Sequence, residues 1–168
     1  MKTALNKILL IVLLLCLTVL PLTAQTGKFY STNNELSSSL INQIFQDKRG
    51  FIWIATEYGL NRFDGLRFSN YKHISGDSTS IKNNYVRTLF EDSRQNLLVG
   101  CIDGLMKYDS ETDTFREIPM IRAGKRVFPH ITQMQKLHNG EIWVVTTGQG
   151  IFRLDEDCLL YTSPSPRD

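Results

Sequence analysis

Short apolar runs bounded by turn residues follow one another along residues 41–155 of the chain. The run Phe51–Ala55 (FIWIA) returns as Ile142–Val145 (IWVV). Continuous apolar runs of this length are typical of strands covered on both faces. The turn sequences Asp47–Gly50 and His138–Gly140 precede these runs and supply glycine for tight hairpins. The pattern therefore predicts an all-β protein built from short strands.

The apolar runs belong to a repeat of about 45 residues. Residues 42–64 align with residues 87–109 without a gap, and a third copy follows after one inserted residue near Thr147. A fixed period of this length marks a repeat architecture. The coinciding positions are Asp47 and Asp92; Trp53 and Trp143; Gly59, Gly104 and Gly150; and Asp64, Asp109 and Asp155.

Each copy predicts four strands, of which the first is the least clear. Ile41, Ile44 and Phe45 have a spacing that also fits one face of a helix. We interpret the segment as a strand, because a helix of one turn is too short to stand alone. Four-stranded units with this period predict an incomplete β-propeller of about three blades. A solenoid of β-hairpins is the structural alternative.

The repeat divides the chain into the following predicted parts. A signal peptide occupies residues 1–24 and an N-terminal strand or linker occupies residues 25–40. Blade 1 covers residues 41–84, blade 2 residues 85–129, and a partial blade 3 residues 130–155. Residues 156–168 form a tail that is either non-native, resembling translated adapter DNA, or a natural disordered Ser/Pro end.

The first residues have the order of a secretory signal. Lys2 and Lys7 flank the start of the apolar run 8–20, which is followed by Pro21 and a small residue, Ala24, before the expected cleavage site. A membrane-spanning helix is the alternative, but the run is shorter than the roughly 20 residues that a span requires. We therefore expect an exported, periplasmic protein.

Charge and cysteine content exclude two classes of protein. Removal of the leader takes away two of 19 basic residues, and the remaining 17 balance 17 acidic residues. A neutral chain lacks the basic footprint of a nucleic-acid-binding protein, so no nucleic acid partner is expected. Cys16, Cys101 and Cys158 are too few for a disulfide scaffold, and Cys16 lies in the leader.

The stretch DKRGFIWIATEYGLNRFDGLRF resembles the two-component regulator propeller repeat of the periplasmic sensor regions of Bacteroides-type hybrid histidine kinases. The resemblance covers about residues 28–155. The second copy departs from the pattern at Gln95, Leu98 and Cys101, and the third has Leu137 in place of the turn aspartate. In many propellers an N-terminal strand completes the last blade. Because that blade is absent here, we expect the segment Lys28–Ser31 to be poorly paired.

The resemblance implies a longer parent protein, of which this chain is an N-terminal fragment. Further blades would close the ring, and a membrane helix would anchor the parent in the inner membrane and connect it to kinase and phosphorelay modules. The parent would be a homodimer that senses a glycan or oligosaccharide. Alternative functions are a secreted propeller enzyme similar to streptogramin lyase and a structural propeller for protein interaction.

The chain contains no phosphate loop, nucleophile elbow, paired zinc ligands or kinase signature. We therefore predict no catalytic residues, metal ligands or cofactor within it. The repeated aspartates are expected to cap turns, and the tryptophans to lie between blades. His73, His130 and His138 are expected at the surface or in turns, and Arg122, Lys125 and Arg126 in a basic loop.

Ligand contacts are expected in the loops, because loops on a rigid scaffold are free to vary. The loops between the second and third strands share one end of the propeller with the connectors between blades. An aromatic face together with hydrogen-bonding side chains suits a carbohydrate. The candidate contacts are Glu57, Tyr58, Asp103 and Gln149.

Overall fold

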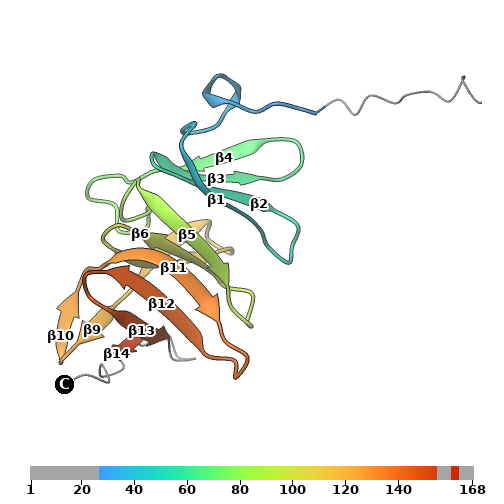
Figure 1. Cartoon of the computed structure of the whole chain (residues 1–168). Coiled ribbons are helices and arrows are strands. Elements are labelled where there is room, and N and C mark those ends of the chain that lie inside the picture. The colour runs from blue at the N-terminus through green and yellow to red at the C-terminus, as the bar shows by residue number, and fades with distance from the viewer. Residues whose placement is uncertain (1–26, 155–159, 163–168) are drawn as a thin grey trace, which may run out of the picture.

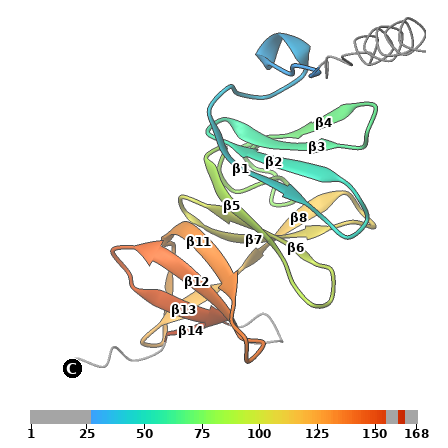
Figure 2. The ribbon, with the colours of Figure 1, turned by 45° about the vertical axis from the view of Figure 1, so that its right-hand side comes forward.

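The computed structural model describes residues 27–154 and 160–162. The predicted signal peptide, Asp155, Cys158 and most of the predicted tail lie outside these residues. Within them, a single 3-10 helix, η1 (Thr32–Asn34), accompanies an all-β fold. Figures 1 and 2 show three sheets stacked side by side. The predicted blades of four antiparallel strands are confirmed.

The first two sheets have the same topology. Blade 1 has the order β1 (Ile41–Gln46), β2 (Ile52–Thr56), β3 (Gly59–Phe63) and β4 (Phe68–Tyr71). Blade 2 repeats it with β5 (Val86–Glu91), β6 (Leu97–Cys101), β7 (Gly104–Asp109) and β8 (Thr114–Ile118). The first strand of each copy, whose spacing also fitted a helix, is a strand. Its register shifts at an equivalent position in all three copies.

The third sheet departs from the expected partial blade. It contains β11 (His130–Lys136), β12 (Ile142–Thr147) and β13 (Ile151–Leu154), and the backbone of β14 (Leu160–Thr162) adds a fourth antiparallel strand. Residues 160–162 lie within the predicted tail, residues 156–168. The expected basic loop is corrected. It forms a hairpin of β9 (Met120–Arg122) and β10 (Lys125–Val127), which extends the same sheet to six strands. Ala123 and Gly124 both have positive φ, as the tight turn between these strands requires.

Equivalent side chains form the two interfaces between blades. Trp53, Ala55 and Leu60 of blade 1 pack against blade 2, where their partners include Val99 and Met106. The other face of blade 2 packs against blade 3 through Leu98, Leu105, Ile131, Val144 and Phe152. Trp53 is fully buried, whereas Trp143, at the equivalent position of blade 3, is partly exposed. The difference arises because no fourth sheet covers that face of blade 3 among the described residues.

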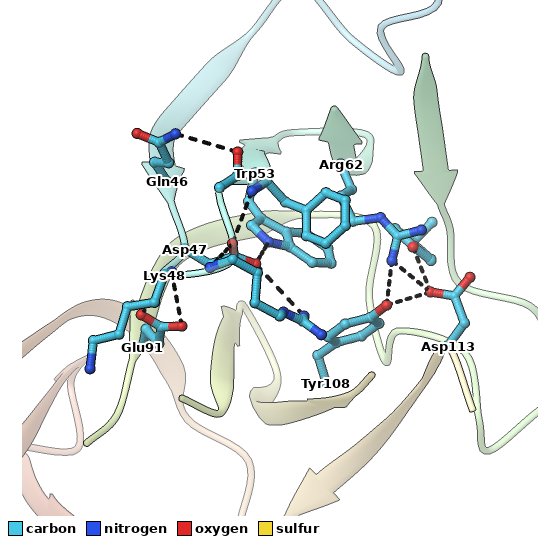
Figure 3. Close-up of polar contacts among 12 residues, drawn as sticks. Gln46, Asp47, Lys48, Trp53, Arg62, Glu91, Tyr108 and Asp113 are labelled. Atoms are coloured by element: carbon cyan, nitrogen blue, oxygen red, sulfur yellow. Dashed lines mark hydrogen bonds and ion pairs between the residues drawn. The ribbon is translucent and has the colours of Figure 1, made fainter. Parts of the chain in front are cut away.

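Aspartates cap the turns that begin the second strands. Asp47 accepts hydrogen bonds from the backbone N–H groups of Arg49 (3.0 Å) and Phe51 (2.9 Å), and from the indole N–H of Trp53 (2.8 Å), as Figure 3 shows for the indole. Asp92 binds the backbone of Arg94 and Asn96 in the same way. Each turn thereby satisfies backbone donors that the hairpin would otherwise leave unpaired.

Further aspartates cap the turns between third and fourth strands. Asp64 accepts hydrogen bonds from the backbone N–H groups of Leu66 and Arg67, both at 2.7 Å. The bond from Arg67, followed by that from Leu66, lowers the pKa of the Asp64 carboxyl. Asp109 accepts the N–H of Glu111 at 3.0 Å. The third copy lacks the first of the two capping aspartates. There Asn139 accepts the N–H of Glu141, which in turn accepts the indole N–H of Trp143.

Gln95, in the β5–β6 turn of blade 2, has a left-handed backbone conformation. Gln95 has φ 64°, at the position where blade 1 has Gly50 with φ 91°. A side chain in this region costs about 1–2 kcal/mol, whereas glycine costs about 0.5–1 kcal/mol in chain entropy. Gln95→Gly is therefore expected to raise the free energy of unfolding by up to about 1 kcal/mol, measured by urea denaturation. Gly50→Gln is the matched reverse change and should lower it. A gain in stability from both changes would contradict the assigned turn geometry.

The segment before blade 1 covers one face of that blade. The ring of Tyr30 packs against Phe63 and Phe68, with centroids 5.5 and 5.3 Å away. Ser37 N–H donates to the side-chain oxygen of Asn61 at 2.9 Å. Residues 28–31 form no strand, in agreement with the expected lack of pairing, but they are packed on blade 1 through Tyr30.

Candidate ligand site on the loop face

The hairpins between second and third strands lie at one end of the blades, together with the connectors between blades. We call this end the loop face. Three hydrogen bonds hold the connectors there: Gly59 N–H to Asn84 O (2.7 Å), Glu57 N–H to Leu40 O (3.1 Å) and Cys101 S–H to Asn83 O (3.8 Å). The sequence-predicted sharing of one end by hairpins and connectors is therefore seen in the structure.

Glycine is required where the first connector meets its hairpin. Gly59 has φ 127°, and a Cβ added there would lie 2.9 Å from the carbonyl oxygen of Tyr71. Any other residue would strain the backbone and collide with this oxygen. The repeated glycine thus allows β4 and the following connector to approach the hairpin closely.

Three segments meet at Tyr85, which precedes β5. Its hydroxyl donates a hydrogen bond of 2.9 Å to the carboxylate of Glu57, in the hairpin of blade 1. This bond raises the pKa of Tyr85 above its usual value. On its other side, the Tyr85 ring meets the imidazole of His130 edge-on, with centroids 6.4 Å apart. Tyr85 therefore links the loop of blade 1 to the first residue of β11.

Two polar atoms of the loop face lack hydrogen-bond partners. Asp103 accepts a bond from Asn83 Nδ2 at 3.3 Å through Oδ2, but its Oδ1 is buried and unpaired. The Nε2 of His130 is likewise buried and unpaired. Buried polar atoms in folded proteins are normally satisfied by protein or by water. A hydroxyl group can both donate to a carboxylate and bond to an imidazole nitrogen, so a hydroxyl-bearing ligand fits this chemistry.

The structure separates the four sequence-predicted contacts. Glu57 and Asp103 bond to the connector that contains Asn83 and Tyr85. Tyr58 is 56% exposed, with Lys72 Nζ lying 4.4 Å from its ring centroid. Gln149 lies in the separate hairpin between β12 and β13.

Sequence reasoning missed Asn83 and Tyr85, and it placed His130 at the surface or in a turn. His130 is instead partly buried against Tyr85. The available signal was the presence of polar and aromatic residues immediately before the first strand of a blade. Connector residues do not follow the alternation of a strand, so the directions in which their side chains point could not be derived from periodicity.

Other chemistry at the loop face is limited. Burial raises the pKa of the Cys101 thiol to about 12, so this thiol stays protonated and is a poor nucleophile at neutral pH. His73 lies in the connector, with its Nδ1 3.0 Å from the carbonyl oxygen of Ile81. Within residues 27–154, no group of three or more His, Cys, Asp or Glu side chains is arranged to hold a metal ion. The described part of the chain also contains no helix long and apolar enough to span a bilayer.

The model of the two component regulator propeller family matches residues 35–58, which include β1, β2 and the Glu57 hairpin. A histidine kinase of Formosa agariphila, P4, is 39% identical over 74 residues, which make up 42% of this chain and 5% of that relative. The aligned part is therefore a small fraction of the relative's length.

Two kinds of solved structure are similar to the chain. An extracellular domain assigned to a hybrid two-component system of B. thetaiotaomicron has a TM-score of 0.67 at 29% identity, over 77% of this chain and 19% of that domain. A streptogramin B lyase has a TM-score of 0.57 at 18% identity, over 80% of this chain and 43% of the lyase. The likeness to the lyase shows the propeller fold alone. The chain spans about one fifth of the two-component domain.

Proposed function

We propose that this chain is part of an exported sensor propeller of a hybrid two-component system, and that its loop face binds an oligosaccharide. The parent would be a membrane-anchored, homodimeric histidine kinase, and ligand binding would bias its signalling state. Export and the kinase connection are supported by the relatives, which include a histidine kinase and extracellular domains of two-component systems.

One observation carries the ligand proposal. Asp103 Oδ1 and His130 Nε2 are buried polar atoms without partners, in a region that also contains Tyr85 and Glu57. Hydroxyl groups satisfy such acceptors and donors, and an aromatic ring offers a surface for a sugar ring. Oligosaccharides combine these two properties. The residues provide binding groups and no arranged nucleophile, which favours recognition over catalysis.

Binding is tested by titrating the purified chain with a panel of neutral and acidic oligosaccharides in a calorimeter. We expect one member to bind, and Asp103→Asn and Tyr85→Ala each to weaken it by about 10–100-fold. That range corresponds to the roughly 1.5–3 kcal/mol of a hydrogen bond to a charged group. Asp64→Asn is the matched control, because Asp64 caps a turn at the other end of blade 1. Equal weakening by all three variants, or no binding by any panel member, would contradict the proposed site.

Signalling is tested separately with the intact parent in membrane vesicles. The oligosaccharide that binds the chain should change the rate of autophosphorylation, and Asp103→Asn should remove this response. A parent that binds the sugar without any change in phosphorylation would refute the sensor role while leaving the binding site in place.

A further inference from the structure

A polar hollow lies at the end of the blades opposite the loop face. It has a volume of about 280 Å³ and is lined by the β5–β6 turn, the outer strands and the β7–β8 turn of blade 2, together with Arg49 from the β1–β2 turn of blade 1. Its walls contain three cationic side chains and several neutral hydrogen-bonding groups: Arg49, Lys107, Arg116, Asn96, Tyr108 and Ser110. We call it the cationic hollow.

Two of the cations lie directly opposite each other in the sheet. Lys107 on β7 is the register partner of Arg116 on β8, so both side chains project from the same face of blade 2. Like charges at directly opposed positions destabilise a sheet. The equivalent pair in blade 1 is Arg62 opposite Ser69, which has no such repulsion. Blade 2 therefore carries a repulsive pair that blade 1 lacks.

Arg62, the equivalent cation of blade 1, is also paired with a carboxylate of the chain, that of Asp113. Arg62 donates hydrogen bonds to Tyr108 and to Asp113, the latter at 3.1 Å, and Figure 3 shows this network. Burial alone would raise the pKa of Asp113, but hydrogen bonds from Tyr108 and Tyr71 and the charge of Arg62 lower it. By contrast, no carboxylate of the described chain lies within 4.0 Å of Lys107 Nζ.

The carboxylates near the hollow form only long ion pairs with its two arginines. Arg116 lies 3.8 Å from Asp109, and Arg49 lies 3.7 Å from Asp47. Both distances exceed hydrogen-bonding range, so the guanidinium groups keep donors for another acceptor. Asp109 also accepts the N–H of Glu111, whose exposed carboxylate is the remaining acid in the wall.

We propose that the cationic hollow binds a small oxyanion, a carboxylate or a sulfate group, between Lys107 and Arg116, and that Arg49, which also lines the hollow, adds to its positive charge. Arginine and lysine are the side chains that bind such groups most strongly, and a bound anion removes the repulsion between the paired cations. The site is independent of the loop face, since its residues come from the opposite turns and the outer strands.

The proposal is tested by thermal unfolding and calorimetry of the chain in sodium sulfate, sodium acetate and sodium chloride at equal ionic strength. We expect sulfate, acetate or both to raise the Tm above that in chloride with a saturable dependence on concentration. Lys107→Gln should weaken this binding at least tenfold. It should also raise the Tm in chloride, because the repulsive pair is gone. Lys125→Gln, on the exposed hairpin of β9 and β10, should leave anion binding unchanged.

The two anions distinguish the chemistry of the ligand. Binding of sulfate alone assigns the site to a sulfate group, and binding of acetate alone assigns it to a carboxylate. Equal Tm values in all three salts would show ionic screening only and would overturn the proposal. An unchanged anion affinity in Lys107→Gln would also overturn it, and the gain in Tm in chloride checks that this variant is folded.

Discussion

Trp53→Ala is expected to lower the free energy of unfolding by about 3–5 kcal/mol, the usual cost of truncating a buried tryptophan. The side chain is fully buried between blades 1 and 2. Its ring meets Tyr108 edge-on at 4.9 Å and stacks on Tyr71 at 5.8 Å. The substitution also removes the indole donor of Asp47, whose carboxylate is buried. Urea denaturation followed by circular dichroism measures the loss.

Trp143→Ala is the matched control for this prediction. Trp143 occupies the same position of the repeat but is partly exposed and bonds to Glu141. Because less of its surface leaves water on folding, its truncation should cost about 1–2 kcal/mol. Equal losses from the two substitutions would show that the face of blade 1 is not covered by blade 2 as described.

Gly100→Ala is expected to lower the free energy of unfolding by about 1–3 kcal/mol, the usual cost of overpacking a core. A Cβ at this position would lie 2.7 Å from the methyl carbons Cγ2 of both Ile131 and Thr88. These methyl groups belong to β-branched side chains close to their own backbones, so they cannot swing away. The glycine allows β6 of blade 2 to approach β11 of blade 3.

A control and a rescue separate this effect from a general cost of removing glycine. Gly27→Ala should leave stability unchanged, because a Cβ at Gly27 meets no atom within 4 Å. In an Ile131→Ala background, Gly100→Ala should cost less than it does in the wild-type chain, because one of the two clashing methyl groups is absent. Full additivity of the two substitutions would place Gly100 and Ile131 out of contact.

The strands could be predicted from the sequence because the same pattern occurs three times. One copy of FIWIA would also fit a buried helix segment, but its return in register with turn aspartates and glycines favours strands. Gly100 was not singled out, since it falls where the other copies have Ala55 and Val145 and its role depends on side chains of the neighbouring blade. Residues 160–162 could not be placed in a strand, since their sequence does not match the repeat.

The candidate site was predictable only in part. Glu57 and Asp103 follow from the position of their hairpins, which the repeat fixes. Tyr85 and His130 join them through contacts between a connector and two different blades. Such contacts depend on the angle at which blades pack, and a single sequence does not contain that angle. The cationic hollow was missed for the same reason, because its lining residues come from two sheets.

The most direct test of stacked copies of one unit is a nuclear Overhauser spectrum of the folded chain. We predict cross-peaks between the rings of Trp53 and Tyr108, from blades 1 and 2, and between Tyr85 and His130 at the loop face. Absence of both sets from a well-dispersed spectrum would contradict the packing of the blades and the ligand site that depends on it.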